Sequence, residues 1–169
     1  MLTRSGGRRR AKNARMRNSE SGSVRPEKLT PARVLREARH RLRVRYCECD
    51  PMGVAHHSSY VAWLEIGRTE LLRDCGVTYA DLEKAGTFLV VVGLDVRYRR
   101  PVRYDDVVEV RTFWRGGSKV KVEHAYEVVV VERAGEACEE LCAGASTTLA
   151  CVDGDGRVRV LPDWLVSGA

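Results

Sequence analysis

Long apolar runs are absent from this sequence of 169 residues. Without a run of about 18 apolar residues, we expect no membrane-spanning helix. The first residues also lack the apolar segment of a secretory signal, which argues against export. The chain is 44% hydrophobic and 31% charged, which is typical of a globular protein, and its length suits one domain with a tail.

The six cysteines match neither a disulfide framework nor a common zinc motif. The chain lacks a secretory signal and is not a short cysteine-dense scaffold, which argues against disulfides. Cys47-x-Cys49 and Cys138-x3-Cys142 also depart from the usual spacings of zinc ligands. We therefore expect reduced cysteines that pack in the fold, a cytoplasmic location, and neither a metal site nor a cofactor.

Positive charge is concentrated near the N-terminus. Residues 1–40 hold 12 of the 29 Lys and Arg residues but only 3 of the 23 Asp and Glu residues, so the remainder is slightly acidic. Residues 1–38 have few large apolar side chains with which to offset the entropy of ordering, so we expect a disordered basic extension. A transit peptide and a nucleic-acid contact arm are alternatives, but a plain solvated extension is favoured and nucleic acid is not an expected partner.

One long helix is the clearest element in the sequence. Its largely apolar stripe recurs at helical spacing and consists of Tyr60, Trp63, Leu64, Gly67, Arg68, Leu71, Leu72 and Cys75. Ser58 and Ser59 offer N-caps, and Gly76 suits the end of the helix. Because a glycine in mid-helix costs about 1 kcal/mol relative to alanine, Gly67 indicates that a strand approaches the helix backbone closely.

Alternation of apolar and polar residues on both sides of this helix indicates β-strands. The predicted strands cover residues 41–46, 88–100, 107–114, 119–132 and 137–152. Hairpin turns are expected at Gly116-Gly117 and Ala134-Gly135, and Pro31 can start a short helix through Arg39. We predict an α+β domain over residues 39–168, in which a curled antiparallel sheet of about five strands wraps around one long central helix.

The segment from Tyr46 to Tyr60 concentrates chemically active residue types where the first strand leads into the long helix. A helix N-terminus presents unpaired N–H groups and a positive dipole end, which polarise a carbonyl and stabilise an oxyanion. A carboxylate opposite these groups acts as a general base on water or as a nucleophile. Asp50 is the candidate, although an aspartate at such a turn also commonly forms an Asx-turn or a cap.

Residues 45–65 read RYCECDPMGVAHHSSYVAWLE, and residues 97–106 read RYRRPVRYDD. These segments resemble the 4-hydroxybenzoyl-CoA thioesterase family of the hotdog superfamily, including the Tol–Pal-associated acyl-CoA thioesterases. The resemblance covers about residues 40–152. It implies a hotdog fold, hydrolysis of an acyl-CoA to a free acid and CoA, and dimers whose sheets join edge to edge. It also implies that the active site lies at the dimer interface and that dimers often pair into tetramers.

The resemblance also assigns roles to individual residues. Asp50 matches the family's catalytic aspartate, and His57 matches a histidine that orients substrate or water. The expected substrate-binding residues are Gly53, Val54, Ser59, Tyr60 and Glu65. Glu65 is also readily explained as an ion-pair or interface residue, and His124 lies on an apolar strand face and is expected in the core. His56 and Ser59 replace the aromatic residue and the asparagine that are common in the family, so the size of the acyl group is open.

Three other functions compete with acyl-CoA hydrolysis. A close relative is hydrolysis of an acyl chain from an acyl carrier protein, and a different class is a non-catalytic acyl-CoA-binding sensor. A dehydratase of the same superfamily is disfavoured because its longer helix motif is absent. The sequence does not choose among the basic residues that can meet CoA phosphates: Arg99, Arg100, Arg103, Arg115, Lys119 and Lys121.

Overall fold

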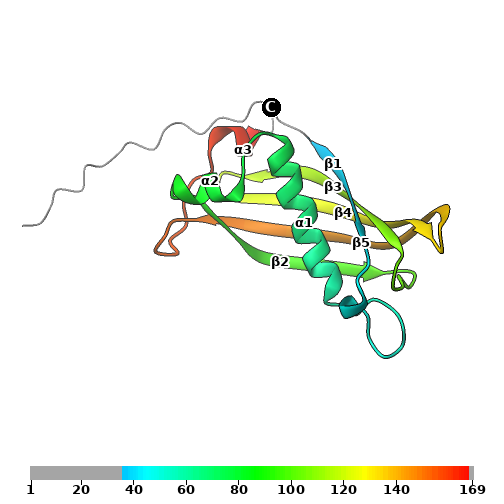
Figure 1. The fold of residues 1–169 in the computed structure, drawn as a ribbon. Helices are drawn as coiled ribbons and strands as arrows, with labels where there is room; N and C mark the ends of the chain where they lie inside the picture. The colour runs from blue at the N-terminus through cyan, green and yellow to red at the C-terminus, as the bar shows by residue number, and fades with distance from the viewer. Residues whose placement is uncertain (1–35, 168–169) are drawn as a thin grey trace, which may run out of the picture.

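A computed structural model describes residues 36–167, and within that range five strands form one antiparallel sheet (Figure 1). The strands are β1 (Glu37–Arg43), β2 (Phe88–Tyr98), β3 (Val107–Ser118), β4 (Lys121–Arg133) and β5 (Glu136–Val152). Their spatial order is β1-β3-β4-β5-β2, so β1 and β2 are the edge strands. The helices are α1 (Ser59–Asp74), α2 (Tyr79–Lys84) and α3 (Asp163–Ser167).

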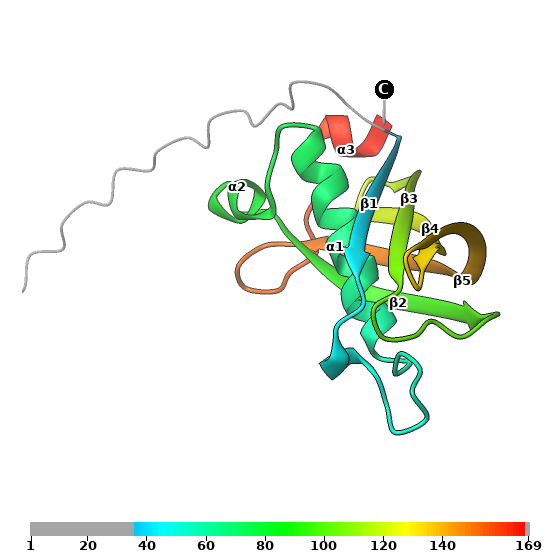
Figure 2. The same ribbon diagram turned by 45° about the vertical axis from the view of Figure 1, so that its right-hand side comes forward.

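Helix α1 lies across one face of the sheet, which curls around it (Figures 1 and 2). Every residue of the predicted stripe is buried, from Tyr60 to Cys75. Gly67 faces β3 at close range: a Cβ at this position would collide with the Thr112 hydroxyl and lie 2.9 Å from Val110 Cγ1. The predicted α+β fold with one central helix is therefore confirmed, and so is the close approach at Gly67.

The buried side chains form two clusters along α1. One surrounds the first turns of the helix and includes Tyr60, Trp63 and Val102. The other surrounds its C-terminal half, where α2 and α3 contribute Leu82 and Leu165. The first cluster fixes the helix end that faces the loop after β1.

Two details differ from the sequence-based expectations. The β3–β4 chain reversal lies at residues 118–121, whereas Gly116 and Gly117 lie within β3 where its register with β4 shifts. Both glycines have positive φ angles of 87° and 155°, and a Cβ at Gly117 would collide with the Lys121 carbonyl, so the pair forms a bulge and not the turn. The predicted helix ending at Arg39 is wrong in its last residues, because β1 starts at Glu37 and pairs with β3.

Edge pairing also explains the start of the domain. β1 begins two residues before the boundary expected at residue 39, because Glu37 lies opposite Phe113 in the sheet. The predicted basic extension, residues 1–38, otherwise lies outside the described residues. Among the helices of residues 36–167, none is long and apolar enough to cross a membrane.

Candidate active site

The loop of residues 45–58 connects β1 to α1 and projects beyond the end of the sheet (Figure 1). Both ends of the loop are held by residues 101–106. At the entry, Val44 N–H donates to the Asp106 carbonyl at 2.9 Å. At the exit, Ala55 N–H donates to the Val102 carbonyl at 2.8 Å, and Val54 forms a bridge with Arg103. The loop is therefore anchored at both of its ends.

Glu48 ties the loop to the helix from inside. Its carboxylate is 8% exposed and accepts hydrogen bonds from Trp63 Nε1 at 3.0 Å and from the Arg45 guanidinium at 2.8 Å. The Arg45 backbone N–H donates to the second oxygen at 2.7 Å. Burial raises the pKa of Glu48, but the hydrogen bonds from Arg45 and Trp63 outweigh this and lower the pKa overall. Glu48 thus holds the loop as a carboxylate.

Asp50 lies in a tight turn within this loop and is half-buried. One carboxylate oxygen accepts the Met52 N–H at 2.8 Å, and the Asp50 carbonyl accepts the Gly53 N–H at 2.9 Å. Gly53 has a φ of 76°, which favours glycine and closes the turn. The Asx-turn that was considered from the sequence is therefore present. It uses Oδ1, and no hydrogen bond to Oδ2 is found among residues 36–167.

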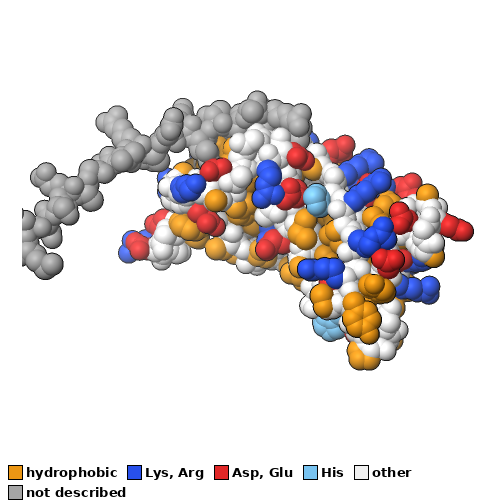
Figure 3. All heavy atoms as spheres, in the orientation of Figure 1, with side chains coloured by type: hydrophobic (Ala, Val, Ile, Leu, Met, Phe, Trp, Pro, Cys, Tyr) orange, Lys and Arg blue, Asp and Glu red, His pale blue; other side chains and the backbone are white. Residues whose placement is uncertain are grey.

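An open pocket of about 340 Å³ brings the loop together with the start of α1 and the end of β2. Its lining residues are Asp50, Val54, Ala55, His57, Tyr60, Tyr98, Arg99, Arg100 and Pro101. Figure 3 shows hydrophobic, basic and histidine side chains close together at the lower end of the molecule, where Figure 1 places this loop. Four of the predicted site residues therefore share one pocket: Asp50, Val54, His57 and Tyr60.

The other three predicted residues have different surroundings. Gly53 lies in the Asp50 turn, and the Ser59 hydroxyl donates to the Glu48 carbonyl at 2.9 Å. Glu65 pairs with Arg68 at 2.7 Å on the helix. None of these three side chains lines the pocket, so their substrate contacts stay predictions.

Two tyrosines form the wall next to Asp50. Tyr60 is buried in α1, and Tyr98 from the end of β2 packs edge-on against it with ring centroids 4.9 Å apart. Burial raises the pKa of Tyr60 to about 12, so its phenol is neutral at physiological pH. The Tyr98 hydroxyl also donates to the His57 carbonyl at 3.0 Å. Sequence reasoning did not single out Tyr98, although it shares the alternating pattern of Leu94 and Val96 that predicted β2.

The two neighbouring histidines differ in their contacts. His57 is exposed and lines the pocket, and its ring stacks at 4.0 Å on that of His56. His56 Nδ1 forms a hydrogen bond with the Ser58 hydroxyl at 2.7 Å. Ser58 is the N-cap residue of α1, but its hydroxyl turns to His56 instead of capping the helix amides. The side chain that usually covers a helix N-terminus is thus directed elsewhere.

Position in the sheet separates the candidate phosphate-binding residues. Arg99 and Arg100 line the pocket beside Asp50. Lys121 lies opposite Ala150, near the C-terminal end of β5, whereas Tyr98 lies opposite Ala143. Lys119 and Lys121 therefore belong to the far end of the sheet. The buried His124 is 8% exposed, as expected for a core residue, and burial together with the Arg68 charge lowers its pKa to about 4.

Comparison with known proteins supports this geometry. A family model described as the thioesterase-like superfamily matches residues 44–168. The putative acyl-CoA thioesterase YneP of Bacillus subtilis is 33% identical over 128 residues, which is 73% of this chain and 88% of that protein. The DHNA-CoA thioesterase structure from Staphylococcus aureus is 31% identical with a TM-score of 0.67, covering 76% of this chain and 85% of that one.

The 4-hydroxybenzoyl-CoA thioesterase structure from a Pseudomonas strain has a TM-score of 0.68 and covers 80% of this chain and 100% of that one. At 20% identity it supports the fold alone, and it confirms the predicted hotdog architecture. The prediction of an enzyme of the thioester hydrolase class is also confirmed, whereas the Tol–Pal-associated branch stays a prediction. This chain belongs to the thioesterase-like superfamily.

Proposed function

We propose that this protein hydrolyses acyl-CoA thioesters to a free carboxylic acid and CoA, with Asp50 as the reacting carboxylate. The observation that carries the proposal is the pocket in which Asp50 and His57 meet the first turn of α1. The names of relatives such as the Bacillus subtilis protein support an acyl-CoA substrate. An acyl carrier protein presents the same thioester and stays an alternative substrate.

The chemistry follows from the two sides of the pocket. The positive end of the α1 dipole polarises the thioester carbonyl and stabilises the oxyanion that forms when it is attacked. Asp50 either removes a proton from the attacking water or attacks the carbonyl itself, and in both routes the thiolate of CoA leaves. His57 orients the substrate or the water. Tyr60 and Tyr98 form an aromatic wall for the acyl group.

The path of CoA is suggested by the residues at the mouth of the pocket. Arg99 and Arg100 also line a larger groove of about 770 Å³ that runs along the β4–β5 hairpin. Arg100 is paired with Glu140 at 2.8 Å, whereas Arg99 is exposed and has no ion pair among residues 36–167. We therefore assign the CoA phosphates to Arg99 first.

A second copy of this chain is part of the proposal. β2 is an edge strand with several exposed apolar residues, namely Val90, Val91, Val92, Leu94 and Tyr98. An exposed apolar edge favours pairing with another strand. Because β2 ends at Tyr98 beside Asp50, pairing along β2 would bring the partner next to the pocket. Sedimentation analysis tests this: we expect a dimer for wild type and a monomer for Val92→Lys. Tetramers and a cytoplasmic location stay predictions.

A panel of acyl-CoAs distinguishes the enzyme from a sensor. Thiol release is followed for wild type and for Asp50→Ala, and ligand binding is measured separately by calorimetry. Turnover by wild type that is lost in Asp50→Ala supports the proposal. Binding without turnover by wild type on any member of the panel would favour the non-catalytic sensor.

A further inference from the structure

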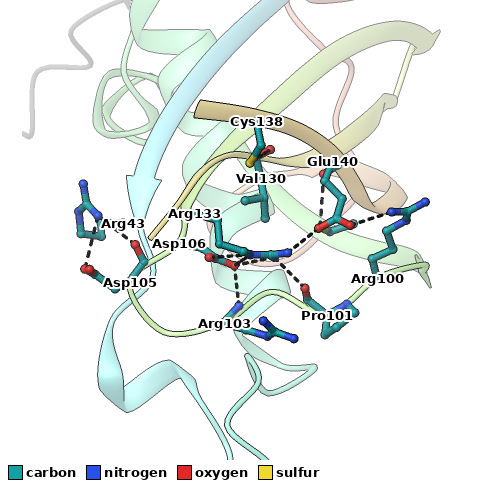
Figure 4. A network of polar contacts seen from close by, with 11 residues as sticks. Arg43, Arg100, Pro101, Arg103, Asp105, Asp106, Val130, Arg133, Cys138 and Glu140 are labelled. Carbon is teal, nitrogen blue, oxygen red and sulfur yellow. Dashed lines mark hydrogen bonds and ion pairs between the residues drawn. The ribbon is translucent and has the colours of Figure 1, made fainter. Parts of the chain in front are cut away.

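A polar network centred on Arg133 lies behind the wall of the pocket (Figure 4). Arg133 is the last residue of β4, and its guanidinium donates to both oxygens of the Asp106 carboxylate at 2.8–3.3 Å. The same group donates to the Pro101 carbonyl at 3.2 Å and to Glu140 at 2.8 Å. Glu140 in turn accepts from Arg100 at 2.8 Å. One guanidinium thus joins the β4–β5 hairpin to residues 100–106.

Residues 101–106 carry the loop that holds Asp50. The Asp106 carboxylate accepts the Arg103 backbone N–H at 2.8 Å, and Arg103 bridges to Val54. Val54 is the residue whose carbonyl accepts the Asp50 N–H at 2.9 Å. A short chain of contacts therefore runs from Arg133 through Asp106 to the backbone of Asp50. The contact with Pro101 is a second route, since Pro101 lines the Asp50 pocket.

The backbone of this segment needs such support. Asp105 has a φ of 69°, a left-handed conformation that residues other than glycine adopt infrequently. It immediately precedes Asp106, whose carboxylate is 2% exposed. A buried carboxylate that loses its cationic partner is strongly unfavourable, so Asp106 fixes where Arg133 lies and Arg133 fixes where Asp106 lies. The pairing holds a strained turn in one geometry.

We propose that Arg133 is a positioning residue for thioester hydrolysis, which acts through Asp106 and the Pro101 carbonyl to hold Asp50 at the amide end of α1. This inference rests on the proposed function. Arg133 lies behind the pocket wall and is not among the residues that line the pocket, so its effect is on the placement of Asp50 and not on substrate binding. A lysine cannot replace it fully, because one ammonium group lacks the planar fork that meets several acceptors at once.

The test compares Arg133→Met and Arg133→Lys with a matched control. Arg111→Met removes another arginine with three acidic partners, Glu109, Glu127 and Glu139, which lies in the middle of β3 away from the pocket. We expect kcat of Arg133→Met to fall about 10- to 100-fold with KM changed less than about twofold, because small misplacements of reacting groups cost rates of this size. Arg133→Lys should lie between wild type and Arg133→Met, and the control should keep the wild-type kcat.

Two further readouts separate positioning from loss of folding. Exogenous guanidinium at millimolar concentration should restore part of kcat to Arg133→Ala, whereas methylammonium should not. Hydrogen exchange of residues 48–57 should become faster in Arg133→Met than in Arg111→Met. The exchange readout does not depend on turnover, so it still tests the inference if Asp50→Asn proves fully active and the proposed function fails. A folded Arg133→Met protein with wild-type kcat and wild-type exchange would overturn the inference.

Discussion

Replacement of Glu48 by glutamine tests how the loop that carries Asp50 is held. The carboxylate accepts hydrogen bonds from three donors, the Trp63 indole N–H and two groups of Arg45. Glutamine has nearly the same shape but only one acceptor oxygen. Its NH2 group would face either the Arg45 backbone N–H or the donors on the other side, so one donor loses its partner.

The magnitude follows from these contacts. Hydrogen bonds to a charged group contribute about 1.5–3 kcal/mol each, and an unsatisfied buried donor costs a similar amount. Because the carboxylate is 8% exposed, solvent replaces little of this loss. We expect Glu48→Gln to lower the free energy of unfolding by about 2–4 kcal/mol at pH 7, allowing for partial rearrangement. Glu83→Gln, which changes an exposed glutamate on α2, is the control and should change it by less than about 0.5 kcal/mol.

The pH dependence of this effect has a definite sign. The folded pKa of Glu48 is lowered, so the unfolded chain binds the proton more readily than the folded one. The stabilisation by Glu48 is therefore complete above the unfolded pKa and is lost as the pH falls through the folded pKa. Urea unfolding of wild type and Glu48→Gln should show a large difference at pH 7 that shrinks below about pH 4. An equal difference at both pH values, or none at pH 7, would refute this account of the loop.

Three other predictions concern the helix packing, a buried histidine and the phosphate contact. Gly67→Ala should destabilise the fold by about 1–3 kcal/mol in urea unfolding despite the better helix propensity of alanine, and a second change of Thr112 to alanine should recover part of this loss. His124, with its pKa lowered to about 4, should stay neutral by NMR at pH 5, and stability should fall as the pH drops from about 6.5 towards 4. Arg99→Ala should raise KM for acyl-CoA about tenfold in steady-state assays at low salt and leave kcat near wild type, with a smaller effect at high salt.

The parts of the fold that the sequence predicted are those determined by local periodicity. The stripe from Tyr60 to Cys75 records a helical period, and each of its members is buried because one helix face packs on one sheet face. The glycine pair at residues 116–117 was misassigned because positive φ angles serve a bulge as well as a turn. Which of the two forms depends on the register with β4, which is a non-local property.

The candidate site was predictable in part for the same reason. Asp50 and His57 lie in one short segment, so their proximity follows from the sequence. The contact between Arg133 and Asp106 joins residues 27 positions apart and depends on how the β4–β5 hairpin curls over the end of the sheet. Glu48 reaches Trp63 only because the loop folds back onto α1. Neither contact has a periodic signal.

The most direct test of the central claim is the kcat of Asp50→Asn for acyl-CoA hydrolysis. Asparagine keeps the size of the side chain and the acceptor for the Met52 N–H, so the turn should survive and KM should change little. Asp155→Asn, in the exposed turn after β5, is the control. We predict that kcat falls about 100- to 10,000-fold in Asp50→Asn and stays at the wild-type value in the control. A folded Asp50→Asn protein that turns over acyl-CoA within about threefold of wild type, less than the smallest effect expected of a general base, would contradict the account.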